Sequence, residues 1–159
     1  MREVVVVSAA RTPIGSIGGT LKAMQPEELL AVALEEAVKR SGVEKAVIDE
    51  VIAGHAKQST DAPNIARVAA LSIQVPESTP AYTVHRQCAS GMQAMLSGMQ
   101  QIQCGYSDVV LVGGVESMSP SFAHMDMLHA HMPGTDAVGI YDSDFPELPG
   151  SEAICVFWV

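Results

Sequence analysis

The sequence predicts an α/β protein in which a mostly parallel sheet with covering helices is followed by an irregular C-terminal tail. Three observations lead to this fold class. Short apolar runs alternate with segments of helical periodicity, the first run is rich in β-branched residues, and the alternation stops after Ser119. The chain has 159 residues, of which 48% are hydrophobic, which is enough for one domain with a real core. We expect this domain at residues 1–119 and the tail at residues 120–159.

The first strand and the first helix have clear sequence signals. Residues 3–10 contain four consecutive valines, a pattern typical of a buried strand in a parallel sheet. Residues 11–19 contain a proline and three glycines and predict a loop. Residues 26–40 carry apolar side chains at helical spacing, begin with a proline and two glutamates, and precede Gly42. These features are the expected start and stop signals of a helix.

The following segments continue the alternation. The sequence predicts strands at residues 50–55, 81–84 and 108–112, and helices at residues 61–72 and 90–103. In the last of these helices, methionine, leucine and isoleucine recur at helical spacing and predict the face that is buried. Because strands and helices alternate, we expect parallel strands joined by crossover connections.

The tail differs from the domain in composition. Residues 120–159 contain six acidic residues and no Lys or Arg, so they carry −6 of the net charge of −9. Four prolines interrupt this stretch, and it shows no convincing period. We therefore expect an irregular acidic tail.

Charge and cysteine content exclude several classes of protein. A net charge of −9 argues against nucleic acid or an anionic membrane as a partner. The three cysteines, Cys88, Cys104 and Cys155, form no CxxC pair, which disfavours both a disulfide framework and a zinc site. The sequence shows no signal peptide, no transit peptide and no apolar run of membrane-spanning length, so we expect a cytoplasmic protein.

Cys88 is the best candidate for chemistry, because it lies where the predicted strand at 81–84 meets the predicted helix at 90–103. The N–H groups at the start of a helix carry partial positive charge and favour a thiolate there. Ala89, Ser90 and Gly91 are small, so the chain can turn sharply and leave the sulfur accessible. The alternative is that Cys88 is a small buried apolar residue, which is the usual situation of an isolated cysteine. Cys104 ends the same helix, and we expect it to be packed in the interior.

Four motifs in collinear order carry a resemblance to a known family. They are VSAARTPIG at residues 7–15, NIAR at 64–67, RQCASGMQA at 86–94 and GGVESMS at 113–119. Together they resemble the thiolases, acyl-CoA acyltransferases such as acetyl-CoA C-acetyltransferase, over about residues 3–121. The fold that this resemblance implies is the N-terminal half of a thiolase.

The resemblance implies a function for Cys88. The matching cysteine of thiolases attacks an acyl-CoA thioester and carries the acyl group as a thioester. The resemblance further implies that the Cys88 backbone N–H helps to stabilise the oxyanion. We therefore expect 3-ketoacyl-CoA formation (acetoacetyl-CoA from acetyl-CoA) or thiolysis, with acyl-CoA as substrate and no other cofactor. The CoA-binding residues, the acyl chain length and the direction of reaction are not predicted.

The residues that complete thiolase chemistry are not found in this sequence. In the family they are a histidine in a Gly-His-Pro motif, an asparagine that holds a water, and a second cysteine in a Cys-x-Gly motif. The surroundings of Cys155 do not match the last motif. Two hypotheses follow, a naturally shortened protein or an incomplete version of a full thiolase.

Other histidines and acids receive smaller roles. His85 lies three residues before Cys88 and is a minor candidate for an activating base, whereas we expect His55 to make a local hydrogen bond. His124, His129 and His131 are irregularly spaced, so we expect no metal site. Glu116 belongs to a motif that we expect to be structural, in which glycines let the strand end approach the catalytic loop.

Two rival interpretations remain open at this stage. The chain could be a catalytically silent assembly module that forms a homo-oligomer or pairs with a full-length thiolase through the sheet edge near residues 81–84. A relative of the ketoacyl synthases would share cysteine-based acyl transfer, but the motifs around Arg11 and Gly91 favour the thiolase branch.

Overall fold

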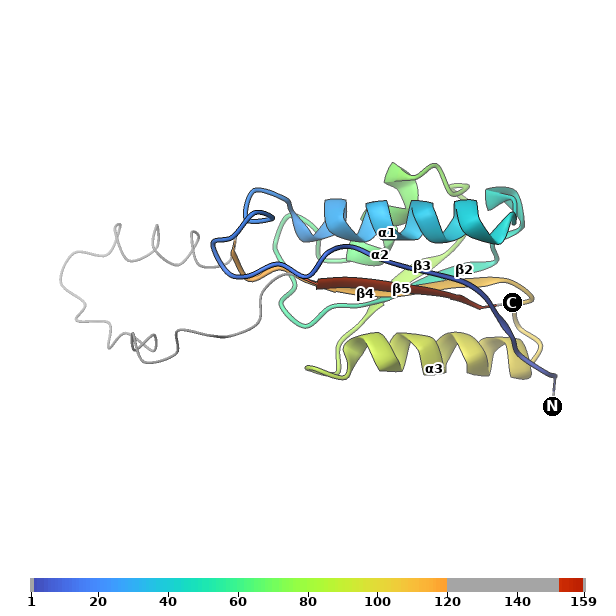
Figure 1. The fold of residues 1–159 in the computed structure, drawn as a ribbon. Helices are drawn as coiled ribbons and strands as arrows, with labels where there is room; N and C mark the ends of the chain where they lie inside the picture. Colours follow the sequence, from blue (N-terminus) through green and yellow to red (C-terminus); the bar gives the residue numbers. More distant parts are fainter. Residues whose placement is uncertain (1, 120–151, 159) are drawn as a thin grey trace.

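The computed structural model describes residues 2–119 and 152–158, which form a single five-stranded sheet with helices on both faces (Figure 1). The strand order is β1-β5-β4-β2-β3. The strands are β1 (Val6–Arg11), β2 (Glu50–Gly54), β3 (Ala81–Val84), β4 (Val110–Glu116) and β5 (Glu152–Trp158). The helices are α1 (Pro26–Ser41), α2 (Ile65–Ser72) and α3 (Ser90–Gln103), with a short 3-10 turn at Lys45–Val47.

Four of the five described strands, β1 to β4, run in the same direction, as the sequence predicts for a mostly parallel sheet. Strand β2 lies between β3 and β4 and pairs with both in parallel. Strand β5 runs antiparallel to both of its neighbours, β1 and β4. The carboxyl ends of β2, β3 and β4 therefore meet at one edge of the sheet, where side chains from distant parts of the sequence come together.

The helices divide the core into two parts. Helices α1 and α2 cover one face of the sheet and α3 covers the other (Figure 1). The larger cluster lies under α1 and α2, and its fully buried members include Leu30, Leu34 and Val51. The smaller cluster lies under α3 around Ile52, Ile102 and Val112. The valines of the central strands fill both faces of the sheet, as expected for strands covered on two sides.

The start and end signals predicted for the first helix are confirmed in α1. Pro26 occupies its first turn, and the carboxylate of Glu28 accepts a hydrogen bond of 2.9 Å from the N–H of Gln25. Gly42 follows the helix with φ of +70°, the left-handed conformation that glycine adopts without steric cost.

Two predicted elements differ from the structure by four residues at one end. Helix α2 begins at Ile65 rather than at residue 61, because the Asn64 side chain accepts a hydrogen bond from the Arg67 N–H and caps the helix there. Strand β4 continues to Glu116, four residues beyond the predicted end, because Gly113 and Gly114 pair with both β2 and β5.

The prediction that the first strand is buried is wrong. Strand β1 lies at the edge of the sheet and pairs only with β5. Ser8 and Ala10 face α1 and are buried, while Val5, Val6 and Val7 are all exposed. Helix α3 packs against β2, β3, β4 and, less extensively, β5, and it leaves the outer face of β1 uncovered.

The prediction of an irregular tail is wrong for residues 152–158, which form β5. This segment inserts between β1 and β4 and satisfies the backbone groups of both strands. Six apolar residues in succession, from Ala153 to Trp158, suit such a central strand. The rest of the predicted tail, residues 120–151 and 159, lies outside the described residues, and the domain boundary at residue 119 stays a prediction.

Candidate active site

Cys88 lies in a tight turn that connects β3 to α3. The N–H groups of Ala89 and Ser90 donate hydrogen bonds of 3.1 Å to the carbonyls of Arg86 and Gln87. The Ser90 hydroxyl closes the turn, because it donates to the Gln87 carbonyl at 2.6 Å and accepts from the Arg86 N–H at 2.9 Å. Ser90 is buried, whereas Cys88 is exposed. The expectation of an accessible sulfur just before a helix start is confirmed.

The backbone of this turn is strained at the residue before the cysteine. Gln87 has φ of +50°, a left-handed conformation that residues with a Cβ rarely adopt. Such conformations persist only where the surrounding contacts enforce them, and they concentrate at functional sites. Among the hydrogen bonds between described residues, none engages the Cys88 N–H. That N–H is the group that the family resemblance assigns to the oxyanion.

Two glycines on the neighbouring strands let the start of α3 lie directly on the sheet. A Cβ on Gly54, at the end of β2, would be 2.2 Å from the Ser90 carbonyl carbon and 2.4 Å from the Gly91 nitrogen. A Cβ on Gly114 of β4 would be 3.0 Å from the Gly91 Cα. Glycine is therefore required at position 54 for the Cys88 turn to occupy its place. The predicted close approach of the GGVESMS segment to this turn is confirmed.

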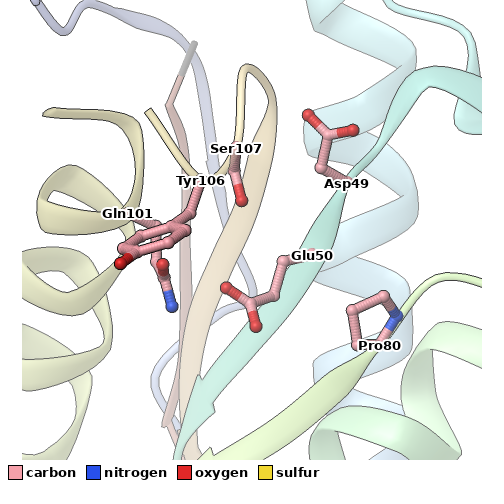
Figure 2. Close-up of a pocket in the computed structure, with 6 residues that line it drawn as sticks. All are labelled: Asp49, Glu50, Pro80, Gln101, Tyr106 and Ser107. Atoms are coloured by element: carbon pink, nitrogen blue, oxygen red, sulfur yellow. The ribbon is translucent and has the colours of Figure 1, made fainter. Parts of the chain in front are cut away.

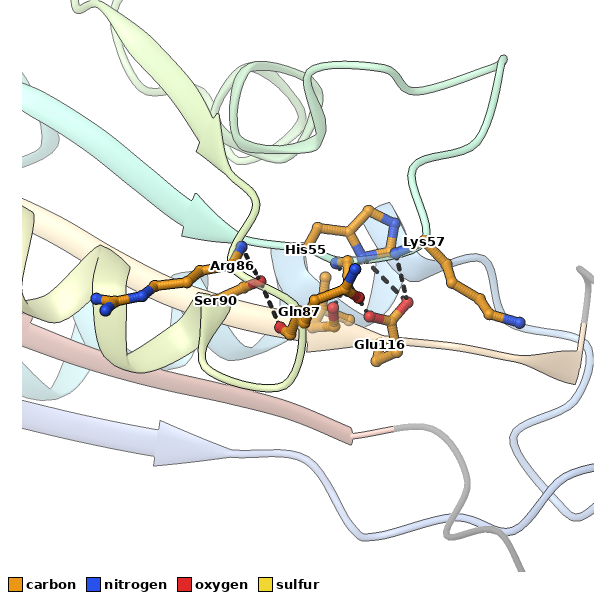
Figure 3. A network of polar contacts seen from close by, with 8 residues as sticks. His55, Lys57, Arg86, Gln87, Ser90 and Glu116 are labelled. Atoms are coloured by element: carbon orange, nitrogen blue, oxygen red, sulfur yellow. Dashed lines mark hydrogen bonds and ion pairs between the residues drawn. The ribbon is translucent and has the colours of Figure 1, made fainter.

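A polar network ties the ends of the same strands together behind the turn (Figure 3). The Nδ1 atom of His55 lies 2.8 Å from the Val115 carbonyl oxygen and 3.4 Å from a carboxylate oxygen of Glu116. That carboxylate also accepts hydrogen bonds from the N–H groups of Ala56 at 3.0 Å and Lys57 at 3.3 Å. His55 thus makes a hydrogen bond, as expected, but the bond is not local, because its partner lies 60 residues away in the sequence.

The two described cysteines differ from expectation in one respect. Cys104 ends α3 as its C-cap, and it is exposed, so the prediction that it is packed in the interior is wrong. The next residues, Gly105, with φ of +78°, and Tyr106, are exposed as well, so the end of the helix is open to solvent. Accessibility alone therefore does not distinguish Cys88 from Cys104.

The other histidines considered from the sequence lie apart from this polar network or outside the described residues. His85 is exposed beside the turn, on the strand side of Cys88. Among the described side chains, no three of His, Cys, Asp or Glu gather in a way that could hold a metal ion. His124, His129 and His131 lie outside the described residues. No helix in the part of the chain that the structure describes has the length and apolarity to cross a membrane.

A cavity of about 530 Å³ lies at the opposite edge of the sheet (Figure 2). Its lining residues are Asp49, Glu50, Pro80, Gln101, Tyr106 and Ser107. Burial raises the pKa of the Glu50 carboxyl above its usual value, and one of its oxygens has no hydrogen-bond partner among the described residues. Burial, and secondly the nearby Glu50, raise the pKa of Tyr82. None of the candidates from the sequence lines this cavity.

Sequence reasoning missed the part that Gly54, His55 and Glu116 play in this site. The signal was present, since Gly54 and His55 lie at the end of one predicted strand and Glu116 lies just beyond another. The carboxyl ends of parallel strands lie at one edge of a sheet, so these positions become neighbours once the two strands are adjacent, as β2 and β4 are here. What the sequence did not show is that the third strand, with its cysteine turn, lies beside them.

Comparison with known proteins identifies relatives of this chain. Residues 4–142 match the family model for the thiolase N-terminal domain. The β-ketoadipyl-CoA thiolase of Pseudomonas aeruginosa is 46% identical over 120 residues, which cover 74% of this chain and 30% of that protein. The human mitochondrial acetyl-CoA acetyltransferase is 40% identical over 119 residues, or 75% of this chain and 28% of the relative.

Solved structures agree with these sequence matches. The crystal structure of the Bacillus anthracis acetyl-CoA acetyltransferase has a TM-score of 0.73 and 54% identity, covering 75% of this chain and 30% of that one. Human mitochondrial 3-ketoacyl-CoA thiolase in complex with CoA has a TM-score of 0.72 and 42% identity, covering 74% and 30%. This chain thus spans about 30% of the length of the relatives it matches. It belongs to the thiolase family and corresponds to the N-terminal domain of that family.

Proposed function

We propose that this chain provides the acyl-accepting half of an acyl-CoA acyltransferase of the thiolase type, with Cys88 as the nucleophile. The observation that carries the proposal is an exposed sulfur in a strained turn. The start of α3, which follows this turn, packs directly on Gly54. A turn that is fixed before the substrate arrives keeps the thiol and the neighbouring N–H groups in one geometry. Family membership supports the choice of an acyl-CoA as the substrate.

The proposed step is a transfer of the acyl group between two thiols. The Cys88 sulfur attacks the carbonyl carbon of the acyl-CoA, a sulfur–carbon bond forms, and the bond to the CoA sulfur breaks. The proton of the Cys88 thiol ends on the departing CoA. During the attack, negative charge develops on the carbonyl oxygen, and the Cys88 backbone N–H, which makes no hydrogen bond among the described residues, helps to stabilise it.

The second half of the thiolase reaction, in which the acyl group leaves Cys88, needs acid–base groups that this sequence does not contain. The acyl group would pass either to a CoA thiol or to the α-carbon of a second acyl-CoA, and both acceptors must lose a proton. The motifs that the family uses for this task are absent from the 159 residues. We therefore propose 3-ketoacyl-CoA formation or thiolysis for the complete system and acyl transfer to Cys88 for this chain.

Several finer expectations remain part of the proposal. No cofactor is expected besides the CoA thioester, and the chain is expected to self-associate or to pair with a full-length thiolase. A cytoplasmic location also stays a prediction, and two of the relatives described above are mitochondrial. The names of those relatives are all names of enzymes, which favours the catalytic interpretation over a silent assembly module.

The test is to incubate the purified chain with acetyl-CoA and to follow both CoA release and the acylated peptide by mass spectrometry. The matched variants are Cys88→Ala and Cys104→Ala, which remove the exposed thiols at the two ends of α3. We expect a stoichiometric burst of CoA release in the wild type and in Cys104→Ala, and no burst in Cys88→Ala. A burst of equal size in Cys88→Ala would overturn the assignment.

A further inference from the structure

We propose that His55 is a positioning residue for the Cys88 turn and that it acts through its Nδ1–H group. This inference rests on the proposed function of Cys88, because it explains how the turn that carries the sulfur is held. His55 directly follows β2, and only 1% of its surface is exposed. Its contacts reach the ends of both strands that flank β2.

His55 connects three strand ends. Its backbone N–H donates a hydrogen bond of 3.0 Å to the Val84 carbonyl, the last residue of β3 before the cysteine turn. Its side chain contacts the Val115 carbonyl of β4 at 2.8 Å. The preceding residue, Gly54, is the one on which the start of α3 rests. A shift of His55 would therefore move the strand end that leads into the turn and the glycine that supports it.

The partners of the ring determine which nitrogen carries the proton. A carbonyl oxygen only accepts hydrogen bonds, so Nδ1 must be the donor to Val115. In the neutral ring Nε2 is then an acceptor, and it is buried with no hydrogen-bond partner among the described residues. The positioning contacts of the ring are thus all made by Nδ1, and Nε2 contributes none.

Glu116 extends the same connection to the loop after β2. Its carboxylate lies 3.4 Å from Nδ1 and accepts from the N–H groups of Ala56 and Lys57. It therefore fixes the backbone that follows His55 (Figure 3). The Val115 carbonyl fixes the ring. The ring is thus held through Nδ1, and the backbone that follows it is held by Glu116, so both contacts fix His55 relative to the end of β4.

Two amide replacements separate the roles of the ring nitrogens. The amide nitrogen of asparagine is attached to Cγ, as Nδ1 is, so His55→Asn can still donate to Val115. The amide of glutamine lies one bond farther out, near the place of Nε2, so His55→Gln loses that donor. Thr79→Val is the matched control, because it removes a buried hydrogen bond of 3.0 Å to the Ile48 carbonyl at the opposite edge of the sheet.

The experiment measures the rate of Cys88 acylation by acetyl-CoA and the amide hydrogen exchange of Ala89 and Ser90, whose N–H groups close the turn. We expect His55→Gln and His55→Ala to slow acylation by about tenfold or more and to speed exchange at these amides. His55→Asn is expected to stay within about threefold of the wild type in both measurements. Thr79→Val is expected to lower the unfolding temperature without changing either of them.

The outcomes distinguish this inference from the proposed function. If His55→Asn and His55→Gln behave alike in amide exchange, the role of Nδ1 is refuted, even if Cys88 is acylated normally. If the wild type is not acylated while the exchange pattern is as expected, the proposed function fails and the positioning of the turn stands. The comparison of the two amide variants holds even if His55→Ala does not fold.

Discussion

The two ends of helix α3 each carry an exposed cysteine, but they differ in everything that surrounds it. At the first end, the Cys88 turn is closed by Ser90 and rests on Gly54. At the other end, Cys104 precedes a glycine turn beside an open polar cavity. The helix dipole is positive at the first end and negative at the second. Because both cysteines are exposed, exposure does not separate them, and the difference that the structure shows lies in the turn and in the end of the helix dipole next to each sulfur.

The largest expected effect follows from removing the close contact at the first end. In Gly54→Ala, the new Cβ would lie 2.2 Å from the Ser90 carbonyl carbon, so the start of α3 must move away from the sheet. We expect the variant to lose Cys88 acylation and about 3 kcal/mol of the free energy of unfolding, measured by urea denaturation. The atoms that the new Cβ would meet belong to the backbone, so a change of side-chain rotamer cannot relieve the contact.

Gly91→Ala is the matched control for that stability measurement. Its Cβ would meet only the Gly114 Cα, at an ordinary distance of 3.8 Å. Alanine in a helix is favoured over glycine by up to about 1 kcal/mol, so the free energy of unfolding should stay constant or increase. Equal destabilisation by both alanines would contradict the close packing described for Gly54.

An intermediate effect is expected from Ser90→Ala. The change removes a hydrogen bond to the Gln87 carbonyl and leaves the Arg86 N–H without its acceptor. We expect a loss of about 1–2 kcal/mol in the free energy of unfolding and slower acylation of Cys88. Ser72→Ala, which removes a hydroxyl bonded to the Ala69 carbonyl at the end of α2, should change stability by less than about 0.5 kcal/mol. If Ser72→Ala costs as much, Ser90 has no special part in the turn.

The smallest effect concerns the cavity near the second end. The pKa of Glu50 is raised in the folded protein, so the folded state binds this proton more tightly than the unfolded state does. Stability is then lost as the pH rises from the ordinary value of 4.5 through the raised value. Glu50→Gln should therefore be more stable than the wild type at pH 7, by less than about 1 kcal/mol, and equally stable well below pH 4.5.

Thermal unfolding at several pH values measures this difference. A gain that persists unchanged at acidic pH would show that the charge of Glu50 is not its source. A variant that is less stable than the wild type at pH 7 would mean that the Glu50 carboxylate has a stabilising partner.

Much of this arrangement is predictable from the sequence, because local signals determine it. Proline and glycine delimit α1, and small residues after Cys88 predict the turn. Strand order is a long-range property, and for this reason the edge position of β1 and the insertion of β5 were not predicted. The same holds for the contact between His55 and Val115, which needs the two strands to be neighbours. The exposure of Cys104 depends on how the chain leaves the helix, which its position in the helix does not reveal.

The most direct test of the central claim compares the two cysteines within one molecule. The wild-type chain is treated with a limiting amount of acetyl-CoA, folded and in urea, and the acyl group on each cysteine is quantified by peptide mass spectrometry. We predict that the folded protein carries at least about tenfold more label on Cys88 than on Cys104, and that urea removes the preference. Equal labelling of both cysteines in the folded protein would contradict the account.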